Sequence, residues 1–516
     1  MRALFAIARA DFLERMRRTS FLVLLVAAVA AAYGYVPARS AGYATMSFGH
    51  TRGLYNSAWI GTLVAVLEMV VLSLLGFYVV RDAVERDERT GVGQILATTP
   101  MTRVQYTLGK FGSHTLVLWC AGGVTLLMAA VMQELRGEVR QLQPWQLALP
   151  FLLLVLPGLA LVAAVALLFE TFRPLRGARG SVLYFFLWIG ALMVSTAQVA
   201  GASRPQPWLD PLGWSAPLLD MKAAVGAHFA DYAGAVNVGV TPSHTPVRTF
   251  LWKGMDWSAV APARLLWALV AVALAALAAV PFHRFDPERL PRPSARAPAE
   301  KRRRHRLPWR SGLFFERLIG RSAGLTLLWA EFALLVRGRR RSWTLVAAAL
   351  WLGCLLTPVP WVRRFLLPVT WLWPLAAWAG MGNQEAHHRT EALVFVCPHP
   401  VRRQLPAAYT AGVLFTALVG FGAALHFALA RAWPELLAWA VASLFIPALA
   451  LASGVVSRGP RLFEVTYLLL WYLGPLNALP LLDFLAPSPT ASAGFLLATL
   501  GLLALAALVR AQRLRG

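Results

Sequence analysis

A segment of mixed charge, residues 81–103, holds the side chains best suited to chemistry with a partner. Its sequence is RDAVERDERTGVGQILATTPMTR, in which Asp87, Glu88 and Arg89 are adjacent. Charges of both signs at this density suit ion pairing with a complementary protein surface. Pro100 ends any helix here. The apolar positions that can share one helical face are Val84, Val92, Ile95 and Leu96. The segment therefore predicts a short amphipathic helix that docks a protein while its apolar face lies on a membrane.

A second segment, residues 389–403, repeats part of this pattern 300 residues later. The sequence RTGVGQILATTPMTR (89–103) corresponds to RTEALVFVCPHPVRR (389–403). The matching residues are Arg89, Thr90, Pro100 and Arg103 in the first segment and Arg389, Thr390, Pro400 and Arg403 in the second. Because both segments follow the second apolar stretch of their part of the chain, an internal duplication explains the match better than chance.

No arrangement typical of catalysis or metal binding accompanies these segments. The sequence offers no Ser-His-Asp set, no paired carboxylates and no cluster with metal-ligand spacing. Gly109-Lys110 is followed by Phe111, so it is not part of a G-x-x-x-x-G-K-[ST] phosphate-binding loop. We expect no enzyme activity, no metal and no cofactor bound by this chain.

The elements that position these segments are apolar stretches long enough to cross a bilayer. The 516-residue chain is 58% hydrophobic and only 14% charged, with a mean hydropathy of +0.58. Stretches of ~20 apolar residues can span the hydrocarbon layer as helices. We predict an all-α polytopic membrane protein of about twelve transmembrane helices in two six-helix halves. The predicted spans are 21–37, 58–80, 112–132, 146–169, 182–200, 263–282, 343–357, 366–382, 407–429, 435–457, 462–480 and 490–509.

The distribution of positive charge sets the predicted orientation and the domain boundaries. Most of the 49 Lys and Arg residues fall in loops on the side that includes both termini, which predicts that both termini are cytoplasmic. The Pro- and Arg-rich segment 283–325 lies on that side and is interpreted as a linker between two halves, 1–282 and 326–516. Its KRRRHR run (301–306) favours contact with anionic lipid headgroups, and we expect no nucleic-acid partner despite the net charge of +25.

Each half opens with a basic amphipathic segment before its first span. The segments are ARADFLERMRRTSF (8–21) and LWAEFALLVRGRRRSW (328–343). Both place an acid before a phenylalanine, Asp11-Phe12 and Glu331-Phe332, and both end in an arginine cluster. Such segments suit helices that lie in the membrane interface.

Two further features bear on a transport pathway. Glu68 is near the middle of the second predicted span, where an acid faces either a cavity or a hydrogen-bonding partner on another helix; both interpretations stay open. Segment 201–262 is rich in Pro and Trp, and we expect short interfacial helices anchored by Trp rings, a cap over the outer mouth of a pathway, or a plain connecting loop.

These features together resemble the permease subunits of ABC exporters of the type-2 superfamily. The resemblance is carried by the elbow-like segment before the first span and by the charged segment after the second, with TPMTRVQYTLGK (99–110) as the most specific part. It covers residues 8–132 well. The second half is similar more loosely, through NQEAHHRTEALVFVCPHPVRRQL (383–405), in which His387 and His388 replace Asp87 and Glu88.

The resemblance implies a mechanism and partners. It implies a permease, moving substrate by alternating access, in a bacterial inner membrane. The segments around residues 81–103 and 383–405 would be coupling helices, with Glu391 among the coupling residues. ATP and Mg would bind to a separate ABC ATP-binding subunit, present in two copies for one fused permease, and a second permease chain is also compatible with the resemblance.

Competing classes predict other features. A twelve-span secondary transporter driven by an ion gradient would share the duplicated topology, but it would require several carboxylates inside the spans, and only Glu68 lies well inside. A membrane-embedded lipid enzyme would require a catalytic set of residues, and none was found.

Overall fold

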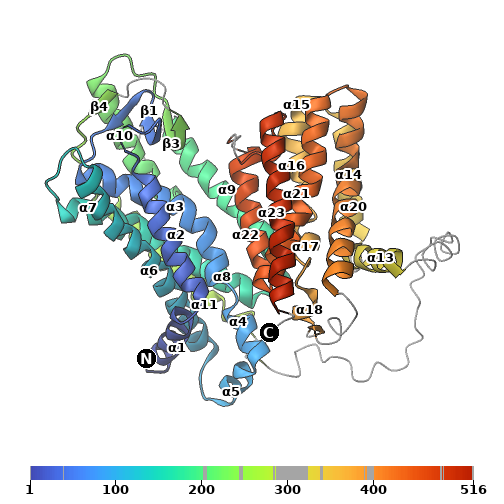
Figure 1. The fold of residues 1–516 in the computed structure, drawn as a ribbon. Helices are drawn as coiled ribbons and strands as arrows, with labels where there is room; N and C mark the ends of the chain where they lie inside the picture. The colour runs from blue at the N-terminus through green and yellow to red at the C-terminus, as the bar shows by residue number, and fades with distance from the viewer. Residues whose placement is uncertain are drawn as a thin grey trace. The chain divides into compact units, whose positions relative to one another are not determined.

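The computed structural model forms two compact units, residues 1–296 and 297–516, and each is described by itself (Figure 1). The structure describes residues 2–38, 40–201, 206–242, 248–282, 285, 323–336, 341–388, 390–391, 400–476, 479 and 482–513. The predicted linker 283–325 lies almost entirely outside these residues.

The first unit is a helical bundle whose central helix is α3 (Ser57–Val80), which is buried along most of its length. It packs against α6 (Arg103–Arg136), α8 (Leu156–Thr171) and α9 (Ala178–Gly201). The rings of Phe77 on α3 and Tyr184 on α9 stack with their centroids 3.7 Å apart. The other helical elements are α1 (Arg2–Met16), α2 (Thr19–Tyr35), α4 (Ala83–Thr90), α5 (Val92–Thr98), α7 (Pro144–Pro150), the π-helix η1 (Phe151–Val155), η2 (Arg173–Leu175), η3 (Pro207–Leu209), α10 (Ser215–His228) and α11 (Ala261–Leu277).

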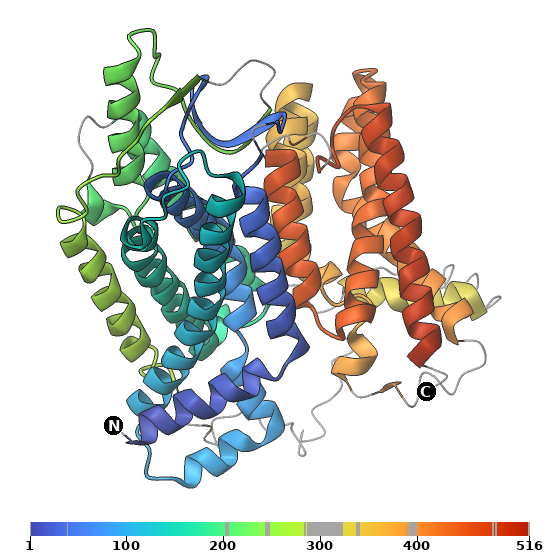
Figure 2. The ribbon, with the colours of Figure 1, turned by 60° about the vertical axis from the view of Figure 1, so that its left-hand side comes forward.

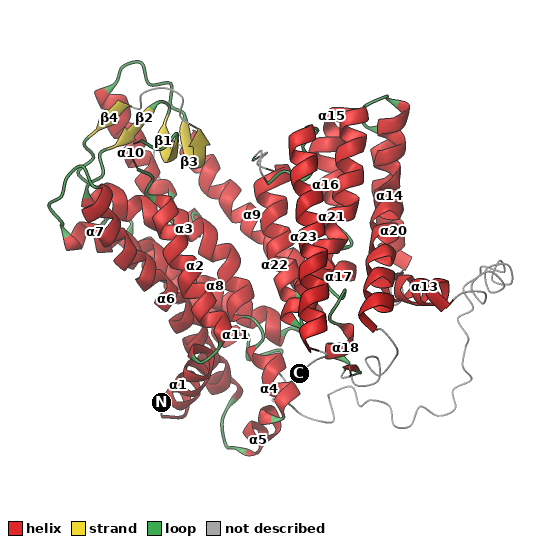
Figure 3. Cartoon of the chain, in the orientation of Figure 1, coloured by secondary structure: helices red, strands yellow, loops and turns green. Residues whose placement is uncertain are grey.

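A four-stranded sheet covers one end of this unit, and α1, α4 and α5 lie at the opposite end (Figure 3). The strands β1 (Tyr43–Phe48), β2 (Thr51–Gly53), β3 (Val236–Pro242) and β4 (Arg248–Phe250) follow the order β3-β1-β2-β4. Strand β1 pairs antiparallel with β2 and β3, whereas β2 and β4 are parallel. The sheet therefore joins the loop after the first span to the segment before the sixth.

The sheet corrects the expectation for segment 201–262. The segment does form short helices, η3 and α10, but it also supplies two strands that the sequence analysis did not predict. Trp214, Trp252 and Trp257 are buried within the unit, whereas Trp208 of η3 is 53% exposed. The ring of Trp252 packs edge-on against Trp59 of α3, with the centroids 6.4 Å apart. The three buried tryptophans therefore help to attach the segment to the rest of the unit.

The second unit is also helical (Figure 2). Helix α13 packs against α20, and α20, α21 and α23 pack in sequence. The elements are α13 (Ala323–Val336), α14 (Arg341–Leu356), α15 (Val359–Trp361), the π-helix η4 (Val362–Leu366), α16 (Leu367–Leu372), α17 (Leu375–Trp378), α18 (Gln384–His387), α20 (Pro400–Leu429), α21 (Trp433–Ser457), α22 (Arg461–Trp471), the π-helix η5 (Tyr472–Leu476) and α23 (Pro489–Arg513).

The prediction of an all-α polytopic membrane protein is confirmed. Among the described residues, seven helices are long and apolar enough to cross a bilayer. The other predicted spans coincide with shorter apolar helices or with helices that contain a π-helical turn. Two of these turns, η1 and η4, end two residues before Pro157 and Pro368, because proline cannot donate the regular helical hydrogen bond.

Candidate functional site

Helix α1 overlaps the elbow segment predicted at residues 8–21 but begins at Arg2 and ends at Met16, and it lies directly on α6. An ideal Cβ on Gly109 of α6 would be 2.9 Å from the Cβ of Ile7, so a glycine permits this close approach. Phe12 is half-buried, and Asp11 is only 6% exposed. Close helix packing thus brings the acid of the elbow against the side chains of α6.

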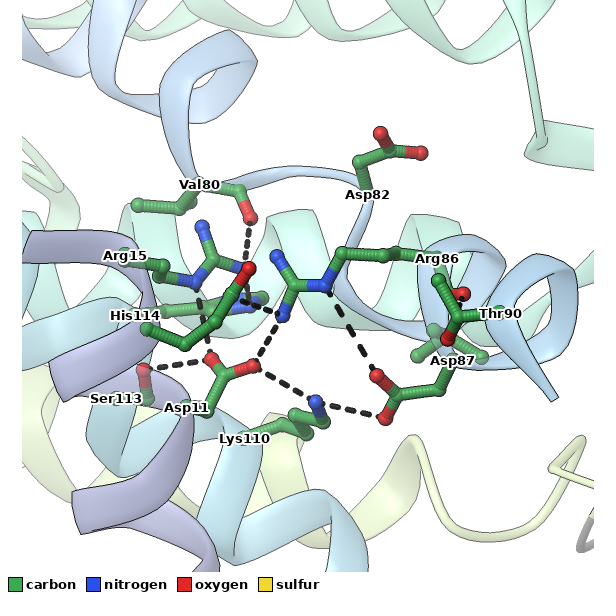
Figure 4. Close-up of polar contacts among 12 residues, drawn as sticks. Asp11, Arg15, Val80, Asp82, Arg86, Asp87, Thr90, Lys110, Ser113 and His114 are labelled. Atoms are coloured by element: carbon green, nitrogen blue, oxygen red, sulfur yellow. Dashed lines mark hydrogen bonds and ion pairs between the residues drawn. The ribbon is translucent and has the colours of Figure 1, made fainter. Parts of the chain in front are cut away.

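Asp11 is the centre of a buried ion-pair cluster (Figure 4). Its Oδ2 accepts hydrogen bonds from Arg15 Nε at 2.9 Å and Ser113 Oγ at 2.7 Å. Its Oδ1 accepts from Lys110 Nζ at 2.8 Å and also from Arg86 Nη2. One carboxylate of α1 is therefore bonded to α6 and to α4, the helix that follows the second span.

Asp87 of α4 completes the cluster from the other side. Its Oδ2 lies 2.7 Å from Lys110 Nζ and accepts a hydrogen bond from Tyr106 Oη at 2.8 Å. Arg15 extends the network by donating from Nη2 to the carbonyl of Val80 at 3.0 Å. Charged groups this deeply buried are tolerated only when they are paired and hydrogen-bonded. The cluster therefore specifies one arrangement of α1, α4 and α6.

The electrostatics of Asp11 reflect competing effects. Burial alone would raise the pKa of this carboxyl, but the positive charges of Arg15 and Lys110 and the hydrogen bond from Lys110 hold the pKa well below its usual range. Asp11 is therefore ionised throughout the physiological range, and its ion pairs persist.

The start of α4 is held by the end of α8. Glu170 accepts hydrogen bonds from the backbone N–H of Asp82 and, at 2.8 Å, from that of Val84. A carboxylate at this position satisfies free N–H groups and complements the helix dipole. Farther along, Arg176 makes a bidentate ion pair with Glu88, at 2.8 and 3.1 Å. Helix α4 is thus attached to α8 and to the loop that follows it.

The structure corrects the prediction of a single amphipathic helix over residues 81–103. Gly91, with φ of +79°, separates α4 from α5, so the segment is two short helices joined by a turn, here called the α4–α5 hairpin. Asp87 is only 5% exposed and Glu88 is paired with Arg176, so neither forms the outer surface. Val84 is buried, whereas Val92 and Ile95 are 44% and 68% exposed, so the apolar residues do not share one face. The exposed surface of the hairpin comprises Glu85, Arg89, Thr90, Val92, Gln94, Ile95, Thr98, Pro100, Thr102 and Arg103.

The inner face of the hairpin rests on aromatic side chains near the end of α11. An ideal Cβ on Gly93 of α5 would be 2.6 Å from Cδ1 of Phe285. The ring of Tyr106 stacks on Phe282 with the centroids 4.6 Å apart and meets Phe285 edge-on at 5.5 Å. Helix α6 follows at once, beginning with a capping box between Thr102 and Gln105. Movement of the hairpin would therefore be transmitted to α6 and to the residues that follow α11.

The corresponding elements of the second unit are arranged differently. Helix α13 carries Glu331, which hydrogen-bonds to Gln404 of α20, and Phe332 meets Phe415 of α20 edge-on at 6.4 Å. Gln404 also donates to Glu385, which pairs with Arg510 at 3.3 Å. The elbow acid therefore meets an amide and an acid here, in place of the three cations around Asp11.

The predicted coupling residues of the second unit are only partly described. Arg389 and the side chain of Pro400 lie outside the described residues. The backbone N–H of Thr390 donates to the carbonyl of Glu385 at 2.9 Å. Glu391 lies 4.0 Å from Arg458, and Arg403 is exposed. His388 makes interactions of its own, and the side chain of His387 lies outside the described residues.

Glu68 lies between helices and is fully buried. Its Oε2 accepts a hydrogen bond from Thr125 Oγ1 of α6, while Oε1 has no hydrogen-bond partner among the described residues. The contact with Thr125 agrees with the packing interpretation. The role of Glu68 in a pathway stays a prediction.

Sequence reasoning missed the cations that complete the cluster. Arg15, Arg86 and Lys110 were not candidates, nor was the helix-capping Glu170. A signal existed for Lys110, because it lies at the end of the motif TPMTRVQYTLGK, just before an apolar span. A lysine at that depth requires a negative partner, and the elbow supplies it.

The fold and this cluster define a polytopic membrane protein in which an elbow helix and a surface hairpin are tied to the same span. Residues 5–286 match the family model described as ABC-2 family transporter protein, which is more than half of the 516 residues. The chain belongs to this family and is therefore a permease, the membrane component of an ABC transporter. No curated protein and no solved structure matched the chain.

Proposed function

We propose that this permease is the transmembrane subunit of an ATP-driven exporter, and that a separate ATP-binding subunit drives it through the α4–α5 hairpin. The observation that carries the proposal is the linkage of the hairpin to four other parts of the first unit. Asp87 and Arg86 tie it to α1 and α6, Glu170 ties it to α8, and Gly93 rests against Phe285. A push on such a hairpin moves the bundle rather than a loose loop.

The docking surface of the proposal is the outer face of the hairpin. It combines the charges of Glu85 and Arg89 with the exposed apolar side chains of Val92 and Ile95. Apolar residues surrounded by charge are typical of the core and rim of a protein interface. In this proposal the hairpin end, with both termini, faces the cytoplasm of a bacterial inner membrane, and the sheet faces outward.

We further propose that the second unit is the second permease half and that two ATPase copies serve one chain. Support comes from each unit taken separately. In each, an elbow helix with an acid packs on the start of a long helix, α1 on α6 and α13 on α20. The acids Asp11 and Glu331 both contact the third-span helix of their own half.

The test is co-purification of the tagged permease with its ATP-binding subunit from membranes. Ile95→Asp and Arg89→Glu should each reduce recovery of the ATPase subunit and its stimulation, because they change the docking face without touching the buried cluster. Lys253→Glu is the matched control, since Lys253 is exposed at the sheet end of the same unit. Wild-type recovery with both hairpin variants would contradict the docking surface. Transport on an ion gradient without nucleotide would contradict ATP-driven export.

A further inference from the structure

The second unit contains a cavity of about 1330 Å³ that the proposed function does not use. It lies beside the elbow α13 and the start of α20, and the ends of α18 and α23 complete it. Ligand pockets for small molecules usually measure about 300–1,000 Å³, so this cavity is large enough for the headgroup and upper acyl chains of a lipid.

One wall of the cavity is apolar. Leu327, Leu334 and Leu335 project from α13 at spacings of seven and eight residues, which place them on one helical face. Leu451 of α21 and Ala408 of α20 face the same space. An aqueous solute would gain little from these side chains, whereas a hydrocarbon chain would be desolvated by them.

The rim of the cavity is positively charged. Arg402 and Arg403 are exposed in the first turn of α20, and neither makes an ion pair with a carboxylate of the described residues. Two acids, Glu331 and Glu385, also line the cavity. Glu385 is paired with Arg510. Burial, together with the nearby charge of Glu385, raises the pKa of Glu331. Three arginines and two acids therefore line the cavity, and the two arginines without an ion pair among the described residues are Arg402 and Arg403.

We propose that this cavity binds an anionic phospholipid of the inner leaflet, with its phosphate at Arg402 and Arg403 and its acyl chains along the α13 wall. The assignment to the inner leaflet rests on the proposed orientation of the permease. Arginine suits phosphate because its planar guanidinium donates several hydrogen bonds. An elbow helix that lies in the interface places this apolar wall at the depth of lipid acyl chains.

The test measures lipid retained by the purified full-length chain, by native mass spectrometry after exchange into detergent with dioleoylphosphatidylglycerol or dioleoylphosphatidylcholine. The wild type should retain phosphatidylglycerol in preference. The double variant Arg402→Gln/Arg403→Gln should retain about tenfold less, because basic residues near an anionic headgroup each add to its affinity. Ala408→Trp on α20, or Ala330→Trp on α13, should expel the lipid by filling the cavity.

Arg103→Gln is the matched control, because Arg103 is equally exposed in the first turn of α6, and it should leave retention unchanged. Equal retention of the two lipids, unchanged retention in the double variant or in both cavity-filling variants, or release of the lipid by inorganic phosphate would each overturn the proposal. No ATPase is present in this measurement, so its result is independent of whether the hairpin docks one.

Discussion

Lys110 Nζ lies 2.8 Å from Asp11 Oδ1 and 2.7 Å from Asp87 Oδ2, so one ammonium group joins the elbow to the hairpin. The two acids belong to segments about 76 residues apart in the chain, and their charges would repel each other without the cation between them. Lys110 itself is carried by α6, the first helix after the hairpin. The cluster thus makes the elbow, the hairpin and a membrane span a single mechanical unit.

Replacing Lys110 with Met should destabilise the protein by about 3 kcal/mol, because two buried carboxylates each lose one of their ion-pair partners. Thermal unfolding of the purified protein, followed by tryptophan fluorescence, measures the loss. Lys253→Met, which removes an exposed lysine, should leave the melting temperature unchanged. Equal melting temperatures for the two variants would show that the cluster is not a source of stability.

Lowering the pH should weaken the attachment of the elbow helix α1 to α6. The pKa of Asp11 is lower in the folded protein than its unfolded value of about 3.9, so the stabilisation is fully present above about pH 4 and is lost as the pH falls further. Hydrogen exchange of residues 2–16, corrected for intrinsic rates, should therefore accelerate relative to α6 as the pH is lowered through this range. Asp11→Asn should exchange rapidly at every pH. A wild-type elbow that stays protected in acid would contradict the assigned role of Asp11.

Gly93→Ala should weaken the packing of the hairpin against Phe285. An added Cβ would fall 2.6 Å from Cδ1 of Phe285, so the ring must shift, and such overpacking typically costs about 1–3 kcal/mol. The variant should show faster proteolysis within residues 81–103 and weaker stimulation of the ATPase. Gly123→Ala on α6 is the control, since an added Cβ there meets no atom within 4 Å. Equal proteolysis rates in the two variants would argue that Phe285 does not support the hairpin.

Much of the fold could be predicted because its strongest determinants are local. Runs of apolar residues located the spans, and Asp11-Phe12 ahead of the first span marked the elbow. The break at Gly91 was missed because a glycine within an amphipathic pattern fits either a loosened helix or a left-handed turn. The inward direction of Asp87 was missed for another reason. It depends on Lys110 and Tyr106, which reach it through tertiary packing and not through spacing along the helix.

The sheet could not have been predicted from local pattern. Strand β1 pairs with β3, so that Phe48 faces Val236 across nearly two hundred residues of chain. Residues 43–53 and 236–250 are short, and each lies in a segment rich in turn-forming residues, so neither shows a clear strand pattern by itself. The end of β2 also depends on a tertiary contact. An added Cβ on Gly53 would fall 2.1 Å from the ring of Trp59, so this position accepts only glycine without a shift of the ring.

Glu331 supplies a test of the second elbow, because its contribution to stability should change with pH in the opposite direction to that of Asp11. Burial, reinforced by the negative charge of Glu385, raises the pKa of Glu331, although Gln404 and Arg510 act against this. A carboxyl whose folded pKa is raised binds a proton more tightly when folded. Stability is therefore fully present below the unfolded pKa of about 4.3 and is lost as the pH rises through the folded pKa.

Glu331→Gln keeps the hydrogen-bonding shape and removes this titration. The variant should unfold at a higher temperature than the wild type at neutral pH, and the difference should shrink as the pH approaches about 4. Glu134→Gln, which changes an exposed acid of the first unit, should show no such convergence. A Glu331→Gln protein that is less stable than the wild type at neutral pH would mean that the carboxylate is stabilised there by Arg510. The second elbow would then be held by an ion pair, as the first one is.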